Sequence, residues 1–134
     1  MKIVIIDGQG GKIGSMLVKK IKELRPAQEI YAIGTNSIAT ATMLKAGAEY
    51  GATGENPVVR NVQDADVVIG PIGIIVADAI LGEVTHKMAA AVASSPAQKI
   101  LIPIKNCHVA VAGTQDLPLG SYIDDAISRL KTIL

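Results

Sequence analysis

Residues 3–14 read Ile-Val-Ile-Ile-Asp-Gly-Gln-Gly-Gly-Lys-Ile-Gly, and this stretch decides the fold. Ile3 to Ile6 form a continuous β-branched run, which is typical of a strand buried on both faces of a parallel sheet. The glycines after Asp7 predict a tight loop, and from Ile13 onward apolar residues recur at helical spacing until Pro26. A buried strand, a glycine-rich loop and an amphipathic helix in this order predict the start of a Rossmann-type α/β domain.

The rest of the sequence continues this alternation. Further strands are predicted at residues 29–33, 48–52, 66–69, 99–104 and 109–112. Helices are predicted from a cap at Thr35 or Asn36 to Lys45, in two short pieces broken near Gly82, the second from Thr85 to Ser94, and from a capping box at Ser121 to the end, with a turn at 54–57. We therefore expect one domain over residues 1–134, a three-layer Rossmann-like fold. Its mostly parallel sheet has five to six strands and helices on both faces.

Composition narrows the function classes. The chain is 49% hydrophobic and lacks Phe and Trp, and its formal net charge is +1. Such a balance is not that of a nucleic-acid binder, and the scarcity of aromatic residues argues against base stacking. Apolar runs stay far below the roughly 20 residues of a membrane span. The single cysteine, Cys107, fits a reducing compartment, so a cytoplasmic location is expected.

The glycine loop carries the first resemblance. Gly8, Gly11 and Gly14 follow a Gly-x-x-Gly-x-x-Gly pattern with Ile13 before the last glycine. This loop resembles that of prephenate dehydrogenases, dihydrodipicolinate reductases and short-chain-type reductases, over about the first third of the chain. The resemblance implies NADP or NAD as cofactor, with the pyrophosphate on the loop and on the following helix N-terminus. The implied binding residues are Gly8, Gln9, Gly10, Gly11, Lys12, Ile13 and Gly14.

A second resemblance spans the whole chain. Segments 7–14, 34–36, 51–56 and 70–73 resemble those of a family of small bacterial single-domain proteins of unknown function. All four segments follow predicted strands, and the carboxyl ends of parallel strands converge on one crevice. We therefore add two segments to the predicted ligand site. They are Gly34, Thr35 and Asn36, and Gly70, Pro71, Ile72 and Gly73.

Two features distinguish this loop from an ordinary NAD site. The end of the second predicted strand carries Thr35 and Asn36 in place of the acidic residue that holds the ribose hydroxyls, which favours NADP slightly over NAD. Asp7 places a carboxylate before the first glycine. At about 8 Å and an effective dielectric near 20 it would repel a phosphate charge by roughly 2 kcal/mol. We therefore expect Asp7 to bind ligand hydroxyls or backbone amides of a neighbouring loop, with a bound metal as the second alternative.

Other polar residues have simpler interpretations. Asp78, Glu83 and His86 lie close in sequence, but the predicted break at Gly82 argues against a metal site. Cys107 and His108 form a possible nucleophile and base, although neighbours in an extended segment point to opposite faces, so a buried structural cysteine is favoured. Glu55 and Asn56 either contact a ligand or serve the predicted turn.

Three functions remain open. The first is a nucleotide or dinucleotide binding protein that senses or carries its ligand. The second is an oxidoreductase whose active site is completed by a dimer partner, and the third is a protein-interaction module on an empty Rossmann-like fold. Whether the protein is an enzyme is left open. The nearly continuous apolar segment at 72–80 predicts a homodimer, because its exposure would be unfavourable.

Overall fold

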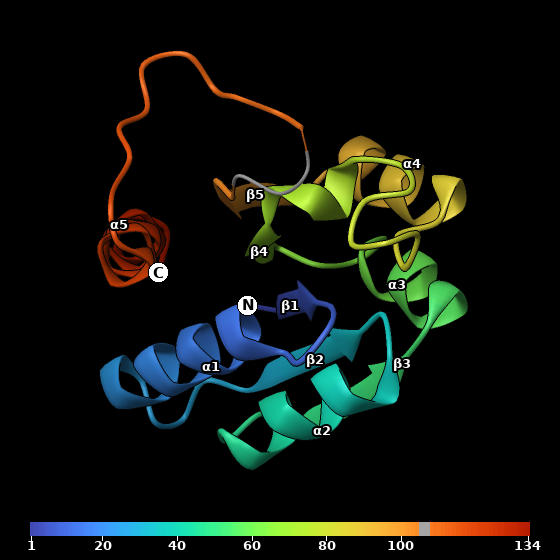
Figure 1. Cartoon of the computed structure of the whole chain (residues 1–134). Helices are drawn as coiled ribbons and strands as arrows, with labels where there is room; N and C mark the ends of the chain where they lie inside the picture. Colours follow the sequence, from blue (N-terminus) through green and yellow to red (C-terminus); the bar gives the residue numbers. More distant parts are fainter. Residues whose placement is uncertain (105–107) are drawn as a thin grey trace.

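One parallel sheet of five strands organises the part of the chain that the structure, a computed structural model, describes, which is residues 1–104 and 108–134 (Figure 1). The strand order is β3-β2-β1-β4-β5. The strands are β1 (Ile3–Asp7), β2 (Ile30–Gly34), β3 (Tyr50–Thr53), β4 (Val67–Pro71) and β5 (Gln98–Ile102). Every described pair is parallel, and Asp7 at the end of β1 aligns with Gly34 at the end of β2. The predicted fold class is confirmed.

Helices cover both faces of this sheet (Figure 1). They are α1 (Lys12–Leu24), α2 (Ser37–Lys45), α3 (Glu55–Asn61), the 3-10 turn η1 (Ile72–Ile75), α4 (His86–Ser94) and α5 (Leu119–Lys131). α1 contacts α2 and α5 on one face, and α3 contacts α4 on the other. Crossovers between parallel strands are right-handed. The chain adds β2 and β3 on one side of β1, and then β4 and β5 on the other side. Because this direction reverses after β3, α3 and α4 lie on the opposite face of the sheet from α1 and α2.

Strand β1 shows why the opening run of the sequence is apolar throughout. Ile3 and Ile5 pack with α1 and α5, and Val4 and Ile6 pack with α3 and α4, so all four side chains are almost completely buried. Alternate residues of a strand point to opposite faces. A central strand covered on both faces therefore has no position for a polar side chain until Asp7.

Two turn regions differ from the sequence predictions. The predicted turn at 54–57 is the start of α3. Gly54 precedes that helix with φ of 104°, and Pro57 lies in its first turn, where a missing backbone N–H is not needed. The first predicted helix after β4 is only the 3-10 turn η1, whereas α4 begins at its predicted cap, with Met88 N donating to Thr85 Oγ1 at 3.1 Å.

The C-terminal part carries two further corrections. The sixth strand predicted at 109–112 is wrong, because these residues belong to an irregular segment, 108–118, that arcs outward before the chain returns to α5 (Figure 1). We call this segment the arm. The predicted capping box at Ser121 is also wrong, since α5 begins at Leu119 and Ser121 already lies inside its first turn. None of the helices within the described residues has the length and apolarity that a membrane crossing requires.

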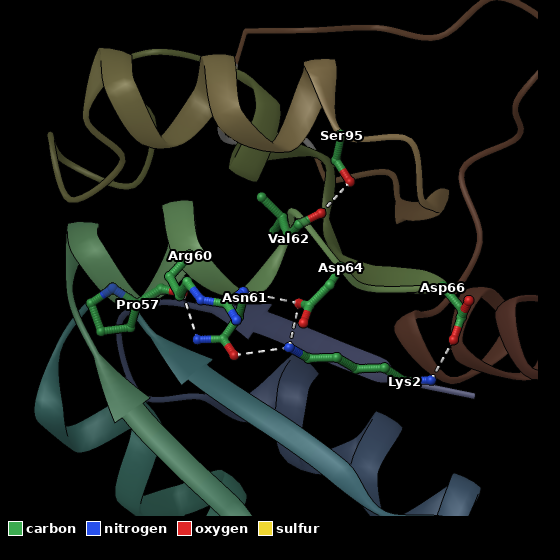
Figure 2. A network of polar contacts seen from close by, with 8 residues as sticks. All are labelled: Lys2, Pro57, Arg60, Asn61, Val62, Asp64, Asp66 and Ser95. Carbon is green, nitrogen blue, oxygen red and sulfur yellow. Dashed lines mark hydrogen bonds and ion pairs between the residues drawn. The ribbon is translucent and has the colours of Figure 1, made fainter.

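The amino end of the sheet is fastened by charged and polar pairs (Figure 2). Lys2 Nζ donates to Asp64 Oδ1 at 2.6 Å and to Asn61 Oδ1 at 3.2 Å, and the backbone N–H of Lys2 donates to Asp66 at 2.6 Å. Arg60 adds a second cation at 3.3 Å from Asp64. These contacts tie the start of β1 to the segment between α3 and β4.

Candidate functional site

The glycine loop, residues 8–14, leaves the carboxyl end of β1 around a buried carboxylate. Asp7 is only 4% exposed. Its Oδ1 accepts from Gly8 N at 2.8 Å, and its Oδ2 accepts from Gly14 N at 2.6 Å. Burial raises the pKa of Asp7, and the Gly14 and Gly8 amides oppose that shift. Asp7 thus binds amides of its own loop, rather than those of a neighbouring loop, and it caps the N-terminus of α1 from inside the protein.

A second carboxylate reaches the same loop from the other side of the sheet. Glu83 lies between η1 and α4, and its Oε1 accepts hydrogen bonds from Gln9 N at 3.0 Å, Thr35 Oγ1 at 2.6 Å and Asn36 Nδ2 at 2.7 Å. Burial tends to raise the pKa of Glu83, but the bonds from Thr35, Asn36 and Gln9 outweigh it, so its pKa is lowered. Glu83 is therefore a well-bound anion at the carboxyl ends of β1 and β2.

The glycines of the loop serve different purposes. Gly11 adopts φ of 75° in the left-handed region and is the N-cap residue directly before α1. A Cβ at Gly8 would lie 2.5 Å from Thr35 Oγ1 and 2.9 Å from Glu83 Oε1. Gly8 therefore allows the close approach of the Glu83 carboxylate. A Cβ at Gly10 would meet no described atom within 4 Å, so Gly10 faces open space.

Other predicted site glycines are explained by packing. A Cβ at Gly14 would overlap Met43 of α2, and a Cβ at Gly70 would overlap the Ile6 carbonyl of β1. Gly34 is similarly crowded by Thr40. The absence of a side chain at these positions lets helix approach helix and backbone approach backbone. A Gly14→Val variant would therefore disturb the fold itself, and it is a poor probe of ligand binding.

The structure brings two of the three predicted site segments together. Thr35 N donates to Asp7 O at 2.9 Å, and Asn36 Nδ2 also donates to Gln9 O at 2.8 Å. Asn36 is the cap of α2 as well, because its Oδ1 accepts from Ala39 N at 2.9 Å. The third segment, 70–73, is mostly buried at the end of β4 and in η1. Its role as part of a ligand site stays a prediction.

The remaining polar candidates are placed apart. Asp78 Oδ2 and His86 Nε2 form an exposed pair at 3.1 Å, whereas Glu83 turns toward Thr35. Within the described residues there is no group of three His, Cys, Asp or Glu residues that could hold a metal ion. Cys107 lies outside the described residues. Glu55 and Asn56 form the first turn of α3.

Sequence reasoning missed a pocket of about 660 Å³ under the arm. We call it the arm pocket. It is lined by Ile13, Pro103, Ile104, His108, Val109, Ala110, Val111, Thr114, Gln115, Asp116, Leu117, Leu119 and Tyr122. The Tyr122 hydroxyl donates to Gln115 O and accepts from Leu117 N at 3.2 Å, which ties the arm to α5. The apolar run at 109–112 is the available signal, but by itself it predicts a strand.

Strand order 3-2-1-4-5, with a glycine loop after the first strand, defines a Rossmann-like α/β domain. Within that class, this chain belongs to the family described as Domain of unknown function (DUF3842), whose profile matches residues 2–134. No curated protein is significantly similar to the chain. A similar solved structure is that of the dodecameric FMN-dependent UbiX-like decarboxylase from Escherichia coli O157:H7. It has a TM-score of 0.49 and 17% identity over 98% of this chain and 77% of that one.

These findings correct the cofactor prediction. NADP or NAD is wrong, because the solved structure that matches is described as FMN-dependent. The hydrogen bonds of the glycine loop give a physical reason against a dinucleotide pyrophosphate there. The Gly8 and Gly14 amides bind Asp7, so a buried carboxylate of the protein holds two of the amides that the pyrophosphate was expected to use. The FMN of the decarboxylase is a property of that protein.

The homodimer stays a prediction, with a weaker motive than the sequence suggested. Ile74 and Ala79 of the apolar segment at 72–80 are buried within their own chain, and Ile75 is half-buried. This segment packs against the α3 and α4 face of the sheet. Light scattering at micromolar concentration should still report about twice the 13.9 kDa chain mass if the prediction holds.

Proposed function

We propose that this protein is a sensor or carrier that binds a phosphorylated small molecule of the nucleotide class at the carboxyl end of its sheet. The observation that carries the proposal is the arm pocket, which opens beside Ile13 in the first turn of α1. Its volume of about 660 Å³ lies within the usual range of small-molecule sites, roughly 300–1,000 Å³. Such sites are mostly apolar with a few converging polar groups, as this one is.

The residues that line the pocket favour a ligand with two parts, a flat ring and a phosphate group. Val111, Leu117 and Leu119 offer an apolar surface to a flat ring, and Thr114 and Gln115 offer hydrogen bonds at the rim. A phosphate group would extend from this pocket toward the N-terminus of α1. There the exposed Lys12 supplies a point charge and Gly10 leaves space.

Binding of mononucleotides to a pocket variant tests this proposal. Val111→Arg should fill the apolar part of the arm pocket with a charged side chain and weaken binding of the tightest ligand at least about tenfold, which is about 1.4 kcal/mol. Ile38→Arg is the matched control, because Ile38 is an exposed apolar residue of α2. Calorimetry with adenosine, guanosine and flavin mononucleotides, after native mass spectrometry of the purified protein, provides the measurement. Equal affinities of both variants and the unmodified protein would place the ligand elsewhere.

A further inference from the structure

Three hydrogen-bond donors from two separate loops converge on one atom, Glu83 Oε1. They are the backbone N–H of Gln9, the hydroxyl of Thr35 and the side-chain amide of Asn36, at 3.0, 2.6 and 2.7 Å. All three are neutral donors. Several neutral donors aimed at one oxygen are the way proteins bind phosphate and carboxylate groups without a matching cation. The protein has therefore built an oxyanion site, and its own carboxylate fills it.

The segment that carries Glu83 holds an unfavourable backbone. Asp78, Ile80 and Leu81 have φ of 66°, 56° and 53°, in the left-handed region that L-residues rarely adopt. Ile80 is β-branched, and such a residue in this region is a clear outlier. Leu81 at the tip is 93% exposed. Backbone strain of this kind persists only where surrounding contacts hold it. Here they are the backbone hydrogen bonds from Asp78 N to Val84 O and from Val84 N to Ala79 O, at 2.8 and 3.2 Å, together with the Glu83 carboxylate.

We propose that the Gln9 amide, Thr35 and Asn36 form a binding site for a phosphate group, and that Glu83 is its resident, exchangeable anion. An incoming phosphate oxygen takes the three hydrogen bonds, and the Glu83 side chain rotates out into water. Gly8 makes the site possible, since any side chain there would enter the space of Glu83 Oε1. The site is separate from the arm pocket, which other described residues line. This inference therefore does not depend on the proposed function.

Phosphate titration of a Glu83 variant tests the exchange. In the full chain carrying Glu83→Ala, inorganic phosphate should bind at least about tenfold tighter than in the unmodified protein, because it no longer competes with a resident carboxylate. The amide resonance of Gln9 in a ¹H–¹⁵N spectrum reports binding at the site itself. Asp78→Asn is the matched control, since it makes the same change of net charge in the same segment. It should leave phosphate affinity unchanged.

A second substitution identifies the donors. Asn36→Asp keeps an oxygen to cap Ala39 N but replaces the Nδ2 donor by an acceptor. Added to Glu83→Ala, it should abolish the gained phosphate binding. Glu83→Gln keeps the shape and one acceptor without the charge, so it should bind phosphate with intermediate affinity, and it serves if Glu83→Ala does not fold. Folded Glu83 variants that bind phosphate no better than the unmodified protein would overturn the proposal and leave Glu83 as a structural contact. These outcomes are independent of mononucleotide binding in the arm pocket.

Discussion

The two ends of the sheet hold their charges in opposite ways. At the amino end, the Lys2 ammonium lies between Asp64 and Asn61, with Arg60 close by, so cations and carboxylates face one another (Figure 2). At the carboxyl end, Asp7 and Glu83 accept hydrogen bonds from backbone amides, a hydroxyl and a side-chain amide. Negative charge there is stabilised by neutral dipoles.

This difference indicates at which end of the sheet a ligand can replace a protein side chain. In an ion pair between two side chains of the same chain, each charge already has its partner, so neither charge needs a ligand. Neutral donors that hold a carboxylate remain suited to any other oxyanion, since they contribute no net charge that selects one partner. The amino end is thus a fastening of the fold, and the carboxyl end is where a ligand can replace a protein group.

The largest expected effect is a loss of stability at the carboxyl end, at a glycine that strand packing requires. Gly70→Ala would place a Cβ against the Ile6 carbonyl and push β4 away from β1. We expect a loss of about 3 kcal/mol in the free energy of unfolding, which lowers Tm by roughly 10 °C in a domain of this size. Gly73→Ala is the matched control, because a Cβ there would make its nearest contact at 3.4 Å, an ordinary distance. Thermal unfolding followed by circular dichroism compares the two. A similar Tm for both variants would mean that the strands have room to separate.

A smaller effect is expected at the amino end. The buried hydroxyl of Ser95 donates to Val62 O at 2.6 Å and accepts from Ala97 N at 3.1 Å. Ser95→Ala would leave both backbone groups without this partner, which costs about 2 kcal/mol. Ser94→Ala is the adjacent control, since Ser94 is exposed and should change stability by less than about 0.5 kcal/mol. Urea unfolding measures both, and equal midpoints would remove Ser95 from the fastening.

Local pattern was enough to predict most of the fold. The β-branched run of β1, the helical spacing after Ile13 and the cap at Asn36 each follow from residues close in sequence, and each agrees with the structure. The helix at 55–61 was missed because Gly54, Asn56 and Pro57 have the composition of a turn. Such residues also suit the first turn of a helix, and only the packing of Val58 between β-sheet and α4 decides between these alternatives.

The site was less predictable for a physical reason. The glycine loop and its neighbour Asn36 could be found from their place after strands, but Glu83 lies 74 residues from its partner Gln9. The position of Glu83 depends on positive φ angles at three consecutive residues, Ile80, Leu81 and Gly82. The sequence pattern does not predict such angles at Ile80 or Leu81. The sequence pattern therefore suggests Glu83 only as a metal ligand. The arm pocket likewise depends on how Tyr122 ties down a segment that has no regular structure.

The smallest expected effect concerns the coupling between the two carboxylates at the carboxyl end. Burial is the largest cause of the raised pKa of Asp7, and repulsion from Glu83 adds to it. Glu83→Gln removes that repulsion, so the pKa of Asp7 should fall. A carboxyl whose folded pKa is raised stabilises the fold fully below its unfolded pKa, and this contribution is lost as pH rises through the folded pKa. The variant should therefore lose the Asp7 contribution at lower pH than the unmodified protein.

The Asp7 carboxyl carbon resonance, followed against pH by ¹³C NMR, measures this pKa directly. Asp78→Asn again provides the control, because Asp78 is exposed and pairs with His86, so its charge should leave the pKa of Asp7 unchanged. A fall in the pKa of Asp7 in the Glu83 variant alone means that the two carboxylates share one low-dielectric site. An unchanged pKa would mean that water screens them from one another. In that case Asp7 and Glu83 would be two independent acceptors of hydrogen bonds. The burial of Asp7 would then be the remaining difference between the carboxyl end and the ion pairs around Lys2.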